Sequence, residues 1–187
     1  MGELSKLNNA TIRSYFDKKI NHEICALRFW KRKLDVNIED YFTLASECSK
    51  ETRLRLLHFK FIHNIYPTNI LLKKMDIATS NQCLWCSETD YIEQAFYNCR
   101  QLELFWKNVK QLILAKYNCR IPLNETTALF GVTKTDISNL RTRREVNHLL
   151  LIAKLSISKF KYGQCKNLNA IFEAEVRMRI PGFHEAM

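Results

Sequence analysis

The residues most able to do chemistry lie in the middle of the chain, where Cys83-Leu-Trp-Cys86 is followed by Gln94 and then Cys99. Two cysteines separated by two residues can grip one zinc ion from a single tight turn. A second pair of ligands further along the chain can then complete a tetrahedron. The spacing predicts a metal site at Cys83, Cys86 and Cys99, with position 94 as the fourth ligand position.

Helices are the elements expected to position these ligands. The chain has only four Gly and three Pro in 187 residues, and long stretches without these breakers carry apolar residues at helical spacing. This favours an all-α fold, a compact multi-helix domain around a short Cys-x2-Cys, zinc-knuckle-like loop. The predicted helices cover residues 12–34, 41–48, 52–65, 101–117, 138–162 and 168–180, with shorter ones after Pro67, at 92–98 and near 126–130.

Three of these helices carry specific expectations. In the helix at 138–162 one face is apolar and the middle is apolar all round, which predicts deep burial, with Gly163 as its C-terminal cap. Thr68 is the expected N-cap of the helix after Pro67. In the helix at 92–98, positions 94 and 99 lie about 140° apart around an ideal α-helix. Both can face one ion only if that helix ends or loosens before Cys99.

The charge of the chain points to an acidic partner. There are 29 Lys and Arg against 19 Asp and Glu, a net charge of +10, and nucleic acid is the commonest partner of such a protein. The alternative is a solvated basic surface without a ligand. The residues predicted to contact RNA or single-stranded DNA are Arg53, Lys60, Lys73, Lys74, Lys107, Lys110, Arg141, Arg143 and Arg144, with Trp85 as a ring that stacks on a base.

Other classes of protein are disfavoured. No apolar run is long enough to span a membrane, and the first residues are too polar for a secretory signal. The seven cysteines are therefore expected to be reduced thiols of an intracellular protein, with nucleus and cytoplasm both open. No Gly-rich phosphate loop, paired-carboxylate motif or nucleophile–base arrangement is present, so neither enzymatic activity nor a small-molecule substrate is expected.

Part of the chain resembles a known family, the zinc-binding region downstream of the polymerase in non-LTR (LINE-type) retrotransposon reverse transcriptases. In that family a Cys pair is followed by Glu-His-x-Phe-x-x-Cys and then by Phe-Trp. The matching segments are residues 56–69, Cys83-Leu-Trp-Cys86, Ile92 to Cys99 with its Glu93-Gln94-Ala-Phe96 run, and Phe105-Trp106. Residues 149–154 and 159–161 are similar to the family's C-terminal tail, less specifically.

The chain departs from that family in two ways. The family histidine is Gln94 here, and a neutral amide oxygen competes poorly with imidazole for zinc. The polymerase Asp-Asp motif and an endonuclease signature are both missing from the sequence, so the resemblance implies an accessory region without catalytic parts. Two alternatives remain open. In one, three cysteines hold zinc and the fourth ligand is Gln94, water, His58 or His63. In the other, the loop is free of metal and is supported by the helices.

The resulting hypothesis is a non-catalytic module that binds RNA or a template–primer structure. We expect three segments: an N-terminal helical part at 1–50, the zinc-binding region at 51–118 and a C-terminal helical part at 119–187. Alternatively, the three form one continuous domain. The alternative is a helical remnant without metal that serves as a protein-interaction or structural module. The oligomeric state does not follow from the sequence.

Overall fold

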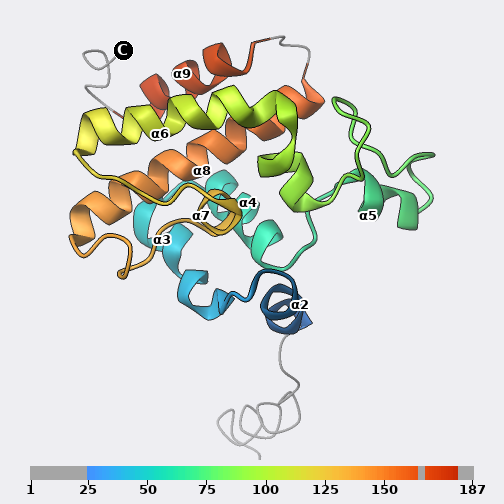
Figure 1. Ribbon diagram of the computed structural model, residues 1–187, viewed down its shortest axis with the longest axis horizontal. Helices are drawn as coiled ribbons and strands as arrows, with labels where there is room; N and C mark the ends of the chain where they lie inside the picture. The colour runs from blue at the N-terminus through green and yellow to red at the C-terminus, as the bar shows by residue number, and fades with distance from the viewer. Residues whose placement is uncertain (1–24, 164–166, 181–187) are drawn as a thin grey trace, which may run out of the picture. The chain divides into compact units, whose positions relative to one another are not determined.

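The computed structural model describes residues 25–163 and 167–180 (Figure 1). The chain divides into two compact units, Met1–Asn37 and Ile38–Met187. In the first unit the structure describes helix α2 (Cys25–Leu34), where the rings of Phe29 and Trp30 meet edge to face with centroids 4.8 Å apart. The helix predicted at 12–34 is confirmed over this part, and its earlier half lies outside the described residues.

The second unit is built from helices joined by short connections. No strand occurs among its described residues, and only one isolated bridge, between Gln82 and Thr89, is present there. The all-α prediction is therefore confirmed. In chain order the helices are η2 (Ile38–Tyr41), α3 (Leu44–Cys48), α4 (Thr52–Ile62), α5 (Asn69–Lys74), η3 (Gln94–Asn98), η4 (Arg100–Leu102), α6 (Glu103–Tyr117), α7 (Glu125–Phe130), α8 (Leu140–Tyr162) and α9 (Leu168–Arg179).

Helix α8 forms the centre of this unit, and α3, α4, α6, α7 and α9 all pack against it (Figure 1). Its middle, from Leu149 to Ala153, is completely buried, as the unbroken apolar run predicts. Further packing comes from aromatic rings. Phe61, Tyr66 and Phe96 form one cluster with ring centroids 4.5–5.4 Å apart, and Phe105 of α6 meets Phe172 of α9 at 5.3 Å.

Asparagine side chains set the starts of three helices. Asn124, Asn139 and Asn167 each accept a hydrogen bond from the backbone N–H three residues further on, at the beginnings of α7, α8 and α9. The sequence prediction differed at two other helix ends. Thr68 is the N-cap of α5 but makes no side-chain cap bond. Gly163 ends α8 in an extended conformation rather than a left-handed one, φ −100° and ψ 173°.

Several polar side chains are buried in the core and find backbone partners. Lys154 Nζ donates to the carbonyl oxygen of Leu129 at 2.7 Å, and Asn147 pairs with both the N–H and the C=O of Val132. Beside that pair Gly131 has φ +109°, and a Cβ there would lie 2.5 Å from Asn147 Oδ1. Only glycine fits this close approach without strain.

None of the helices in the described ranges is long and apolar enough to cross a membrane.

Candidate metal centre

Cys83 and Cys86 lie in a tight loop between α5 and η3. The N–H of Ser87 donates to Cys83 O at 3.1 Å, and the N–H of Cys83 donates to Glu88 O at 2.6 Å. Ser87 adopts a left-handed conformation, φ 61°, which lets the chain reverse there. The loop therefore presents both thiols from one turn, as the Cys-x2-Cys spacing predicts.

Cys99 reaches the same place from a helix that is locally widened. Residues 94–98 form a π-helix, η3, and the N–H of Cys99 donates to Gln94 O at 3.1 Å, a bond between residues five apart. Such single π turns are rare and occur often at functional sites. Because this bond joins positions 94 and 99 across one wide turn, both side chains can approach the loop. The predicted loosening before Cys99 is confirmed.

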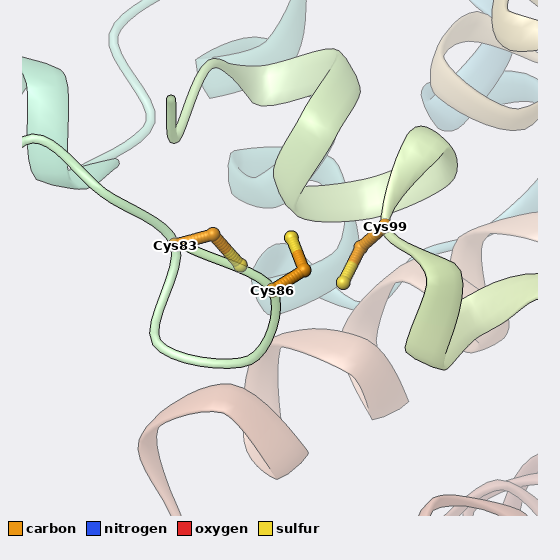
Figure 2. A group of neighbouring side chains, drawn as sticks. All are labelled: Cys83, Cys86 and Cys99. Carbon is orange, nitrogen blue, oxygen red and sulfur yellow. The ribbon is translucent and has the colours of Figure 1, made fainter. Parts of the chain in front are cut away.

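The three thiols converge between the loop and the π-helix (Figure 2). Their Sγ atoms all lie within 4.8 Å of one another, and no other group of three or more His, Cys, Asp or Glu suited to a metal occurs in the described ranges. A tetrahedral zinc ion with Zn–S bonds near 2.3 Å needs sulfur atoms about 3.8 Å apart. Sulfur atoms within 4.8 Å of one another are close to this spacing, so the three thiols are near enough to share one ion. The cluster is not a self-contained knuckle, since its third thiol comes from beyond η3.

Gln94 is the fourth polar side chain at the cluster. Its Nε2 donates to Cys86 Sγ at 3.1 Å, so position 94 does lie beside the thiols. A half-turn of the amide would present its oxygen to the same point, because the two ends of the group have the same shape. The residues present therefore fit three thiolate ligands, with an amide oxygen as a weak fourth one.

The cluster holds its thiols in different protonation environments. Burial raises the pKa of Cys99 to about 12. Desolvation also raises the pKa of Cys86, but hydrogen bonds from the Glu88 backbone and the Gln94 amide outweigh it, and the net shift is downward. The surroundings therefore shift the pKa values of these two thiols in opposite directions.

The cysteine loop is fixed to α8 by a buried ion pair. Asp90 and Lys161 have side chains that are 0% exposed and bond directly to each other. The other Asp90 oxygen accepts the backbone N–H of Asn69 at 2.7 Å. Trp85 lies on the same end of α8, with its ring centroid 5.1 Å from that of Phe160. These contacts hold the loop in place through the protein's own side chains.

The histidines considered as alternative ligands lie elsewhere. His58 is buried and its Nε2 bonds to Tyr41 O at 2.8 Å; burial and the nearby Lys154 lower its pKa to about 3. The ring of His63 meets that of Phe59 at a tilt, with centroids 4.2 Å apart, and lies parallel to that of Phe42 at 6.4 Å. Neither histidine belongs to the thiol cluster.

The residues predicted to bind nucleic acid come from the cysteine loop and from helices α4, α5, α6 and α8. Lys107 and Lys110 share a hollow with Arg100, and no other predicted cation lines it. Trp85 is only partly exposed, because it packs on Phe160 under Lys161. It is therefore less available to stack on a base than the sequence suggested. The remaining predicted residues are exposed or partly exposed on three other helices: Arg53 and Lys60 on α4, Lys73 and Lys74 on α5, and Arg141, Arg143 and Arg144 on α8.

The basic start of α8 has partners within the protein. Arg141 forms an ion pair with Glu145 at 3.0 Å, and Arg143 Nη1 donates to Ile137 O at 2.9 Å. These contacts account for two positive charges placed against the helix dipole. No external ligand is needed to explain them, and a role in nucleic-acid binding stays a prediction.

Sequence reasoning missed the residues that position the site. Asp90 and Lys161 carry no motif, and their pairing depends on a contact between positions 71 residues apart. Arg100 was not among the residues predicted to bind a partner, yet it lines the hollow with Lys107. The signal available in the sequence is the pair Lys107 and Lys110, three residues apart on the helix that follows.

No family model and no curated protein matches this chain.

Proposed function

We propose that this chain is a non-catalytic module that binds single-stranded nucleic acid, with Cys83, Cys86 and Cys99 holding a structural zinc ion. The observation that carries the proposal is the convergence of the three thiols, within 4.8 Å, from two separate elements. Three cysteines brought together across a π-helix in a reduced state are the ligand set of a structural zinc site. The resemblance of residues 52–106 to the reverse-transcriptase zinc-binding region supports the same interpretation.

A bound zinc ion would act as a cross-link. It would join the loop carrying Cys83 and Cys86 to Cys99, the residue between η3 and η4. Helix α6 follows η4 directly, so the ion would fix the start of α6 relative to the loop. Gln94, through its amide oxygen, or a water molecule would complete the coordination.

The nucleic-acid part of the proposal rests on charge. The net charge is +10. Among the described residues, no hydrogen bond or ion pair involves the exposed side chains of Arg53, Lys73, Lys74, Arg100, Lys107 and Lys110. Free surface cations bind phosphates and release counterions, which gives affinity without sequence specificity. RNA and single-stranded DNA both offer this chemistry.

A metal-free module that contacts other proteins is the second candidate. The Asp90–Lys161 ion pair and the bond from Gln94 to Cys86 hold the loop with protein atoms alone. Such a module would need contacts of this kind to keep the loop folded without a metal ion.

Two measurements on one purified sample test these alternatives. Elemental analysis of protein prepared without chelator should find about one zinc per chain, and a Cys83→Ser, Cys86→Ser variant should contain none. Fluorescence anisotropy with labelled oligouridine should give binding that weakens steeply as salt is raised. A metal-free wild-type protein that binds no oligonucleotide at low salt would contradict the proposal and leave the protein-interaction module.

A further inference from the structure

A hollow of about 400 Å³ lies next to the thiol cluster, between η3, η4, α6 and the segment before α7. Cys99 forms part of its wall. Its apolar side consists of Tyr97, Trp106 and Leu123, and its charged side carries Arg100, Lys107 and Lys110. The volume falls within the range of about 300–1,000 Å³ that is usual for sites that take small organic groups.

The three cationic side chains of this hollow are unpaired within the part of the chain that the structure describes. Arg100, Lys107 and Lys110 are all exposed, and none of their side chains makes a hydrogen bond or ion pair with the described residues. Lys107 and Lys110 lie one turn apart on α6, so their side chains share a face of the helix. Glu103 is the carboxylate that lines the hollow with them. Positive charge therefore exceeds negative charge there, and it is free to bind an anion.

The apolar side offers rings held in fixed positions. Tyr97 is half-buried and its hydroxyl donates to Leu123 O at 2.8 Å, while Trp106 Nε1 donates to Phe96 O at 2.8 Å. The two ring centroids are 6.1 Å apart. A ring whose polar end is already bonded loses little freedom when a flat group packs on it. Aromatic side chains of this kind are the usual platforms for unstacked bases.

We propose that this hollow binds one nucleotide of a single-stranded nucleic acid. Arg100, Lys107 and Lys110 hold the phosphates on either side of the nucleotide, and the base packs against Tyr97. The inference rests on the proposed function and names the place where that function is carried out. Paired cations alone would fit any polyanion, but a fixed aromatic wall beside them fits the flat face of a base.

Two triple variants of equal charge test the site. Arg100→Ala, Lys107→Ala, Lys110→Ala removes the hollow's cations, and Arg53→Ala, Lys73→Ala, Lys74→Ala removes three exposed cations of α4 and α5 as the matched control. Binding of labelled oligouridine and oligothymidine is followed by anisotropy over a salt series. Each phosphate contact with a single strand contributes about 0.7 to the salt slope. The first variant should therefore flatten the slope by about 2 and weaken binding more than the control does.

The comparison of the two variants decides the proposal. Equal effects of the two variants, or a larger effect of the control, would overturn the hollow as the site while leaving nucleic-acid binding in place. Failure of the wild-type protein to bind either oligonucleotide would instead refute the proposed function itself. Helix content measured by circular dichroism should be the same in all three proteins, since every substituted side chain is exposed. Comparing the affinities for oligouridine and oligothymidine shows whether the site prefers RNA or single-stranded DNA.

Photochemical cross-linking gives a second readout that needs no variant. Oligouridine containing 5-iodouridine should cross-link to the wild-type protein at Tyr97 or Trp106, identified by mass spectrometry of the digested complex. Polyglutamate is the competitor that tests charge alone and should displace the oligonucleotide only weakly. Cross-links confined to other parts of the chain, or equally strong displacement by polyglutamate, would show a general cationic surface in place of a nucleotide site.

Discussion

Gln94 lies beside the thiol cluster, with Nε2 3.1 Å from Cys86 Sγ. The sequence predicts this position as the fourth ligand position from spacing alone, because thiolate and imidazole ligands follow fixed intervals. What spacing could not give is the direction of the contact. In the structure the amide donates a hydrogen bond to sulfur, an interaction that stabilises a thiolate without binding an ion.

Replacing this amide should therefore strengthen metal binding. We expect Gln94→His to raise zinc affinity by about tenfold or more, equal to about 1.4 kcal/mol, because imidazole is a better zinc ligand than an amide oxygen. Competition against a chromophoric chelator measures the change. Gln111→His, which adds an imidazole at an exposed position of α6, is the control and should have no effect. Equal affinities of wild type and Gln94→His would show that position 94 is not a ligand position.

Lys154 is the second residue whose environment has a measurable consequence. It is fully buried, and desolvation lowers its pKa to about 7 from the ordinary 10.5. Between these two pH values the unfolded chain binds a proton that the folded chain does not, so stability rises with pH in that window. Below pH 7 both states are protonated and the full cost of the buried charge remains.

Removing the charge of Lys154 should reduce the pH dependence of the free energy of unfolding. From pH 7 to 8.5 the free energy of unfolding of the wild type, measured in urea, should rise by up to about 1.4 kcal/mol per pH unit through Lys154. The Lys154→Met variant should lack this rise. Its advantage over the wild type in the free energy of unfolding should be largest at pH 7. Titration of His58, whose pKa is lowered to about 3, falls below the window. Parallel curves for the two proteins would mean that Lys154 keeps its proton in the fold.

At the scale of elements, much of the fold follows from apolar spacing. The buried run in α8, the helices α4, α6 and α9, and the short α7 are all predicted by it, because a face that must be covered has to recur at three and four residues. The Asn N-caps were not used in the prediction, which places the start of the long helix at 138, two residues before the start of α8 at Leu140. Gly163 was misread because glycine permits a left-handed cap without requiring one.

The contact that fixes the cysteine loop lay beyond sequence reasoning. Lysine and aspartate are usually solvated, and nothing in the local sequence marks Lys161 or Asp90 as buried. Only the arrival of the C-terminal part of α8 beside the loop excludes water from both. The same applies to Lys154, whose burial follows from the helices that surround α8.

The loop should depend on this pair. Asp90→Asn leaves Lys161 buried without its partner charge, which should cost about 3–5 kcal/mol in the free energy of unfolding. The cysteines should then react faster with a thiol reagent in the native state. The double variant Asp90→Asn, Lys161→Met removes both charges and should lose less stability than the single one. A single variant as stable as the wild type, with unchanged thiol reactivity, would show that the ion pair does not hold the loop.

For the whole molecule, the missing polymerase motif has a direct consequence. Primer extension needs carboxylates that bind the catalytic metal ions, and the sequence has no Asp-Asp motif of that type. The purified chain should therefore incorporate no nucleotide on a primed RNA or DNA template supplied with magnesium. A reverse transcriptase at the same concentration is the positive control. Template-dependent extension by this chain would refute its assignment as a non-catalytic module.

The link between Asp90 and Lys161 also limits how the protein can be cut into smaller pieces. Residues 51–118 contain every cysteine of the cluster and most of the segment that resembles a zinc-binding region. Excised alone, that fragment would lack Lys161, and Asp90 would be left without its partner. It would also lack Phe160, on which Trp85 rests. We expect such a fragment to show the amide proton dispersion of an unfolded peptide, whereas a fragment from Ile38 to the end of α9 should keep the native spectrum.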